Sequence, residues 1–194
     1  MKNRLNFILV TFMVLLTALP SQAQNWSKLS KDEAESIKRL STKMCTQLQM
    51  SKTAKHEDAG RQVEKHILNQ LNITREDPNY KLKAANFWNK YAEYFVCTNN
   101  GGRRKPQHFL KRVVDMDFTN KVLYDFLLYD EEEYPISVNA IEIYKGKEET
   151  FLDYLNAILA DPKNEEFYSF KEIKLLKSII IEDYGAKTAS ELKN

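Results

Sequence analysis

Two short amphipathic segments near the C-terminal end constrain the fold more than any other feature of this chain. The first, "FLDYLNAIL", follows Thr150, whose side chain can cap a helix, and it closes at Asp161-Pro162. The second, "KEIKLLKSIIIEDY", follows Ser169, which has capping-box spacing to a glutamate three residues later, and it stops at Gly185. Each segment is apolar on one face only, so neither can bury that face by itself. The pattern predicts paired helices that stack on neighbouring helices.

The rest of the chain carries the same helical pattern. Ser30 has capping-box spacing and precedes apolar residues at helical intervals from Ala34 to Leu48, and a narrower apolar stripe follows in 63–71. Pro78 suits the first turn of a further helix, which is expected to end at Cys97. The core face of that helix is expected to hold Leu82, Ala85, Trp88, Tyr91, Ala92 and Phe95. With only five Gly and five Pro, the sequence favours an all-α fold over a loop-rich or all-β one.

The first residues have the pattern of an export signal. Lys2 and Arg4 precede the apolar run Leu5–Leu19, Pro20 ends that run, and the small residues that follow suit a signal-peptidase cleavage site. The run is shorter than the roughly 20 residues that a membrane-spanning helix needs, which favours a cleaved signal over the alternative, a retained anchor. We therefore expect 1–23 to be removed, leaving a periplasmic or secreted protein that does not bind the membrane.

The charge balance does not indicate a nucleic-acid partner. The chain has 29 Lys and Arg against 27 Asp and Glu, but two of the basic residues lie in the predicted signal and no acidic residue precedes Asp32. The cleaved protein is therefore net neutral, without the general basic field that nucleic-acid binding uses. The basic cluster at Arg103, Arg104 and Lys105 is either a solvated loop or a contact for an acidic partner surface.

Two cysteines, Cys45 and Cys97, follow the predicted signal. In an oxidising compartment such a pair often forms a bridge, which would stabilise the fold by about 4 kcal/mol through the entropy of the unfolded chain. Two buried free thiols are the alternative, and the sequence leaves this question open. Neither cysteine has a second ligand at metal spacing, so no zinc site is predicted.

The sequence contains no recognisable catalytic motif. It lacks a Gly-x-Ser-x-Gly nucleophile turn and a glycine-rich phosphate loop. His56, His66 and His108 stand far apart without paired metal spacing, and "HEDAG" lacks the second histidine of a zinc helix. Asp115 and Asp117 are two positions apart and would not face each other on a helix; they are expected at a helix end and a turn. The sequence predicts a non-enzymatic protein with no cofactor and no metal.

The stretch "VNAIEIYKGKEETFLDYL" resembles part of an ankyrin repeat. In this comparison Val138-Asn139-Ala140 stands for the inter-repeat turn, and "ETFLDYL" stands for the helix opening of the family. The ending Asp183–Leu192 looks like the final turn of ankyrin-type chains, and a fainter upstream copy runs through "NNGG", "HFLKRVV" and "NKVLYDFLLY". The Phe-Leu pairs that begin at Phe109 and Phe151 are farther apart than the family period of about 33 residues, and Phe151 replaces the usual proline.

The resemblance covers about residues 99–192 and implies a fold. Helical hairpins over 99–194 would stack as a short ankyrin-like solenoid, with an N-terminal helical region over 24–98 as its cap. Gly146 would form a turn at the end of a loosely structured connection that starts near 130. Leucine-rich hairpins of another kind, in an unrelated α-bundle, are the alternative.

The same resemblance implies protein binding through the concave face lined by the turns. Small exported bacterial proteins with degenerate ankyrin-like repeats include immunity proteins, so occlusion of a periplasmic toxin is the expected role. A structural or envelope scaffold is one alternative, and a small periplasmic hydrolase with an unrecognised site around His108 is another. The residues expected to contact the partner protein are Arg103, Arg104, Lys105, Tyr144, Lys147 and Glu148.

Overall fold

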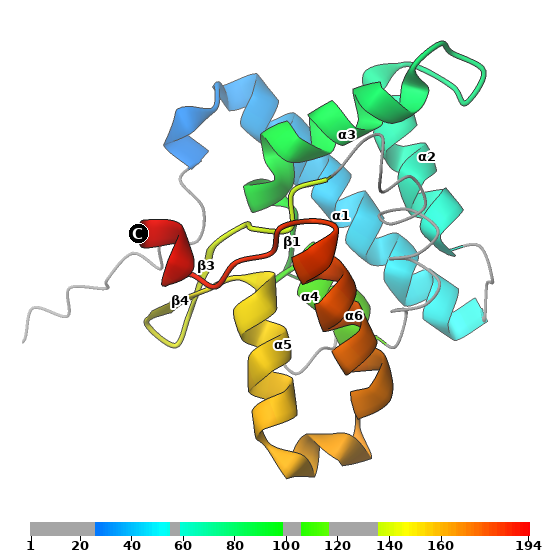
Figure 1. The fold of residues 1–194 in the computed structure, drawn as a ribbon. Coiled ribbons are helices and arrows are strands. Elements are labelled where there is room, and N and C mark those ends of the chain that lie inside the picture. Colours follow the sequence, from blue (N-terminus) through cyan, green and yellow to red (C-terminus); the bar gives the residue numbers. More distant parts are fainter. Residues whose placement is uncertain (1–25, 55–58, 99–105, 117–135) are drawn as a thin grey trace, which may run out of the picture.

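The computed structural model describes residues 26–54, 59–98, 106–116 and 136–194, which are mostly helical (Figure 1). The helices are α1 (Lys31–Ala54), α2 (Ala59–Leu71), α3 (Tyr80–Tyr91), α4 (Phe109–Asp115), α5 (Phe151–Ala160) and α6 (Phe170–Glu182). Short 3-10 turns are η1 (Trp26–Lys28), η2 (Ala92–Tyr94), η4 (Pro162–Glu166) and η5 (Glu191–Lys193). The helical class predicted from the sequence is confirmed, and the predicted signal peptide and basic cluster lie outside the described residues.

Four short strands in the described ranges depart from the all-α expectation. They form two antiparallel pairs: β1 (Val96–Cys97) with β2 (Gln107–His108), and β3 (Glu142–Tyr144) with β4 (Lys147–Glu149). Figure 1 shows α1, α2 and α3 on one side of the molecule, the antiparallel α5–α6 pair on the other, and α4 between α1 and α5. None of the described helices has the length and apolar character needed to cross a membrane.

The apolar stripe of α1 packs as its spacing predicts, whereas α3 differs from the expectation at both ends. It begins at Tyr80 rather than Pro78, because the Asp77 carboxylate accepts a 2.7 Å hydrogen bond from the Thr74 backbone N–H and closes a turn first. It ends at Tyr91 rather than Cys97, since the chain continues through η2 into β1. Leu82, expected in the core, is 39% exposed. The other five residues of its predicted core face are buried: Ala85, Trp88, Tyr91, Ala92 and Phe95.

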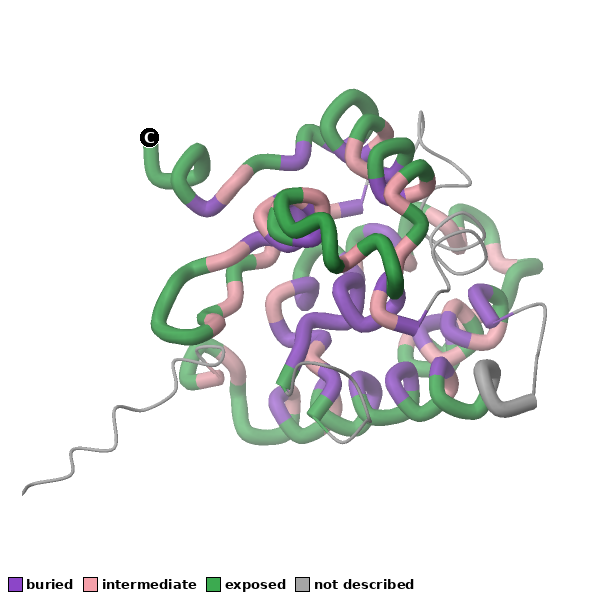
Figure 2. The backbone as a smooth tube through the Cα atoms, turned by 90° about the horizontal axis from the view of Figure 1, so that it is seen from below, coloured by how far each residue is buried: buried purple, intermediate pink, exposed green. Residues whose placement is uncertain are grey.

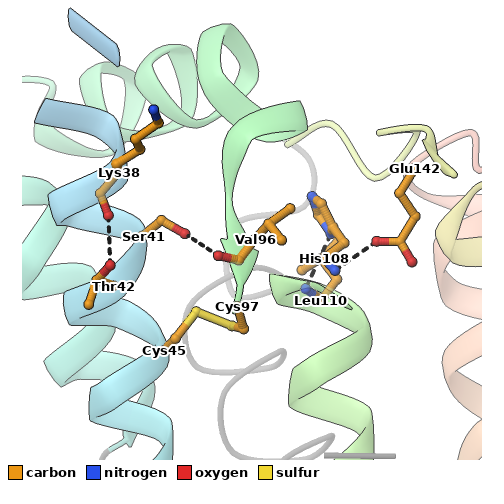
Figure 3. Close-up of a disulfide and its surroundings, with 9 residues drawn as sticks. All are labelled: Lys38, Ser41, Thr42, Cys45, Val96, Cys97, His108, Leu110 and Glu142. Carbon is orange, nitrogen blue, oxygen red and sulfur yellow. Dashed lines mark hydrogen bonds between the residues drawn. A yellow bond between two sulfur atoms is a disulfide. The ribbon is translucent and has the colours of Figure 1, made fainter. Parts of the chain in front are cut away.

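The disulfide left open by the sequence is present between Cys45 and Cys97 (Figure 3). It joins the middle of α1 to β1, and both half-cystines are buried. Beside it, the Ser41 hydroxyl donates a 2.9 Å hydrogen bond to the Val96 carbonyl. The bridge and this hydrogen bond together attach β1, and through it β2, to the surface of α1.

The hydrophobic core runs without a break from the N-terminal helices into α5 and α6 (Figure 2). Trp88 of α3 lies against Phe95 and Phe109, with ring centroids 4.9 and 6.1 Å apart. Its indole N–H donates a 2.9 Å hydrogen bond to the Ser137 carbonyl, so the polar end of this buried ring is satisfied. One aromatic cluster therefore connects the first half of the chain to the second.

The α5–α6 pair forms where the sequence places it. Thr150 and Asp153 make a reciprocal capping box at the start of α5, and Ser169 caps α6. The chain after α6 turns at Gly185, which has φ +59°, and returns to the start of α5. There the Thr150 hydroxyl donates a 2.8 Å hydrogen bond to the Lys187 carbonyl. The cap of α5 and the returning C-terminal segment thus meet at Thr150, which directly follows the end of β4 in the β3–β4 hairpin.

Candidate functional site

The β3–β4 hairpin is the structured turn that precedes α5. Its register pairs Glu142 with Glu149, Ile143 with Glu148, and Tyr144 with Lys147. Both residues of the two-residue loop have positive φ, 51° at Lys145 and 76° at Gly146, as a type I′ hairpin turn requires. The turn at Gly146 is confirmed, but the loose connection expected before it is wrong for 142–144, which form β3. The alternation of Ile141, Glu142 and Ile143 before the glycine was an available sequence signal for the first strand. The signal for the turn was weak, because Lys145 stands where such turns usually have Asn or Asp.

Three of the six predicted contact residues lie together on this hairpin, and the other three, in the basic cluster, lie outside the described residues. Tyr144 is half-buried, with the Lys145 ammonium 5.2 Å from its ring centroid. Lys147 is exposed, and Glu148 forms an ion pair with Lys193 of η5. Figure 2 shows the exposed hairpin extending from the buried centre of the molecule. Whether these residues bind a partner stays a prediction.

A fully buried lysine holds the base of the hairpin. Lys111 of α4 has no exposed side-chain surface, and its ammonium lies 2.9 Å from a carboxylate oxygen of both Glu142 and Glu149. It also donates a 3.3 Å hydrogen bond to the Glu149 carbonyl. A buried charge is tolerated when it is paired and hydrogen-bonded, so this arrangement ties both strands to α4. Sequence reasoning missed Lys111, although a Lys-Arg pair flanked by apolar residues in "HFLKRVV" was an available signal.

His108 supports the same junction with its backbone and its ring (Figure 3). Its backbone N–H donates a 2.7 Å hydrogen bond to Glu142. The ring Nδ1 accepts from the Leu110 N–H at 3.3 Å, so Nε2 carries the proton and donates to the Ala92 carbonyl at 2.8 Å. Burial lowers the pKa of His108 to about 4, against a smaller opposing effect of Glu142. Both ring nitrogens thus bond to backbone groups, and Glu142 contacts the histidine main chain.

Asp115, the last residue of α4, joins the helices on the other side of the junction. Its carboxylate accepts hydrogen bonds from Tyr154, from Tyr168 at 2.6 Å and from Gln107 at 2.7 Å. Burial, and then the neighbouring Asp115 charge, raise the pKa of Tyr154 far above its ordinary value. The expected helix-end position of Asp115 is confirmed, and Asp117 lies outside the described residues. This cluster fixes α4 against α5 and against the segment that leads into α6.

The described residues contain no cluster of three or more histidine, cysteine, aspartate or glutamate side chains able to hold a metal. His66 is half-buried on α2, and its pKa is lowered by burial and by Lys43 and Lys65. His56 lies outside the described ranges. In the described part of the chain, the best candidate for a functional site is therefore the hairpin together with the buried residues that hold it.

Comparison with known proteins adds no family to this description. The chain matched no protein-family model, no curated protein and no solved structure. The ankyrin-like relationship therefore stays a prediction from the sequence.

The stability of the protein is expected to fall as pH drops from 6.5 towards 4. In this window the unfolded chain protonates His108 while the folded chain keeps it neutral, so the unfolded state binds more protons. The loss attributable to His108 is about 2 kcal/mol between pH 7 and pH 5. His108→Asn keeps an acceptor for the α4 cap but does not titrate, so urea unfolding should show a weaker pH dependence. Equal pH dependence in wild type and His108→Asn would contradict the assignment.

Proposed function

We propose that this is a non-enzymatic, exported protein that binds another protein through the β3–β4 hairpin. The observation that carries the proposal is the combination of an exposed hairpin with a buried ionic support. Ile141 and Ile143 are 39% and 37% exposed, which leaves apolar surface available for a partner. Because Lys111 joins both strands to α4, the hairpin loses little conformational freedom on binding, and preorganised contacts bind more tightly.

The more specific role that we propose is that of an immunity or inhibitor protein. Its hairpin would cover the active site of a toxin in the periplasm and exclude substrate by occupying the space. Support comes from the predicted signal peptide and from the resemblance to degenerate ankyrin-like repeats. The order of a hairpin turn followed by α5 and α6 matches the turn and two helices of one such repeat. We propose that this unit is the last of a short stack.

Site-specific photocrosslinking in the source periplasm tests the hairpin contact. A benzoylphenylalanine replaces Tyr144 in one variant and Leu175, an exposed residue of α6, in the control. We expect the Tyr144 position to yield one defined protein adduct, and the Leu175 position to yield none with that protein. Binding through the hairpin is contradicted if neither position forms an adduct, or if the partner crosslinks to Leu175 alone.

The toxin-blocking role has its own readout. The protein in the Tyr144 adduct is identified by mass spectrometry, purified, and assayed for toxicity when expressed in a periplasm without the hairpin protein. Co-expression of the wild-type chain should restore growth. A harmless partner, or toxicity that co-expression leaves unchanged, would remove the immunity role while retaining the binding function.

A further inference from the structure

We infer that the hairpin tip is a cationic contact that docks on an acidic surface of the partner protein. The inference rests on the proposed function and adds the chemistry of the partner to it. The tip is formed by Tyr144, Lys145, Gly146 and Lys147, which are the loop and the first residue pair of the hairpin. Its positive character follows from how the charges of the hairpin are distributed.

All three glutamates of the hairpin are engaged within the protein. Glu142 and Glu149 point to the base, where the buried Lys111 ammonium lies 2.9 Å from each carboxylate. Glu148 forms its ion pair with Lys193 of η5. The negative charges are therefore either held at the base or compensated along the strand, and none of them lies in the loop.

The two lysines of the tip are arranged differently. Lys145 and Lys147 are both exposed, and neither forms a salt bridge with any residue in the described ranges. The Lys145 ammonium lies 5.2 Å from the centroid of the Tyr144 ring, which supports its side chain and leaves the charge accessible. Two exposed ammonium groups on a narrow projection create a local positive potential, which favours an acidic surface on the partner.

The surroundings of the tip favour a protein over other anionic macromolecules. Nucleic-acid binding uses a run of several lysine or arginine contacts to successive phosphates, and two lysines are too few for such a track. Exposed Ile143 and half-buried Tyr144 adjoin the cations, so apolar and aromatic surface lies next to the charges. Interfaces between proteins combine these features, with an apolar and aromatic core surrounded by a charged rim.

The test compares association rates of charge-reversed variants with the purified partner from the Tyr144 adduct. K145E/K147E reverses the tip, and K171E/K174E makes the same change on exposed positions of α6. Surface plasmon resonance at 50 mM and 500 mM NaCl is expected to show association slowed on the order of tenfold for the tip variant at low salt. The difference should shrink to within about threefold at high salt, and the α6 variant should stay within about twofold of wild type.

Each outcome separates this inference from the proposed function. If the Tyr144 adduct forms but K145E/K147E associates at the wild-type rate in 50 mM NaCl, the cationic tip is wrong and the binding function stands. Faster association of that variant would indicate a basic partner surface and would also overturn the inference. Without any Tyr144 adduct, both proposals fall. If wild type binds duplex DNA or phosphatidylglycerol vesicles and K145E/K147E does not, the tip recognises that nucleic acid or lipid surface. The proposal of an acidic protein partner would then be wrong.

Discussion

Replacing Lys111 by alanine is expected to lower the free energy of unfolding by about 3 kcal/mol, because it removes the cation between two largely buried carboxylates. Glu142 and Glu149 keep only 15% and 13% of their side-chain surface exposed, so water can compensate little of the lost pairing. The two glutamates are also cross-strand partners and would repel each other without the lysine. Urea unfolding followed by circular dichroism measures the change.

Two further variants show whether the charge or the volume of the lysine matters. Lys111→Met keeps most of the buried volume, and we expect it to be nearly as unstable as Lys111→Ala since both leave the carboxylates uncompensated. K111M/E142Q/E149Q should recover about half of the loss or more, because the excess negative charge is gone. Lys147→Ala, an exposed lysine on the same hairpin, should change stability by less than about 0.5 kcal/mol. A Lys111→Met variant as stable as wild type would contradict the ionic support of the hairpin.

Removing the disulfide is expected to lower the free energy of unfolding by about 4 kcal/mol. The bridge joins cysteines separated by 52 positions, so it excludes many extended conformations from the unfolded chain. In the folded protein it also attaches β1 to α1. The measurement is urea unfolding of C45A/C97A against the oxidised wild type.

A reductant provides the matched control for this prediction. It should lower the unfolding midpoint of the wild type towards that of C45A/C97A and leave the variant unchanged. The comparison of reduced wild type with the variant isolates the packing of the two buried sulfur atoms from the effect of the cross-link. If C45A/C97A unfolds at the same urea concentration as the oxidised wild type, the bridge contributes no stability.

Local signals predicted the elements that depend on a few neighbouring residues. The caps at Thr150 and Ser169, the stop at Gly185 and the apolar stripe of α1 all appear as expected. Each rests on contacts within about one helical turn, where residue type and spacing alone decide which hydrogen bonds and faces form. The position of Tyr144 and Lys147 at a turn was predictable for the same reason, because Gly146 lies between them in the chain.

The errors and omissions arise where distant segments meet. The helix expected to reach Cys97 ends at Tyr91, because β1 pairs with β2 and is tied to α1 by the disulfide. Lys111 was overlooked because its two carboxylates lie far along the chain, and nothing in its own neighbourhood identifies them. Likewise, both groups bonded to the His108 ring belong to the backbone, whose positions no residue pattern specifies.

The sequence by itself determined that this protein consists of capped, amphipathic helices, including the α5–α6 pair, because helix formation and capping depend on residues close together in the chain. Only the tertiary structure decided that a buried lysine on α4 holds a protruding hairpin by two glutamates, because a charge excluded from water is compensated by whichever groups the folded chain brings within hydrogen-bonding distance.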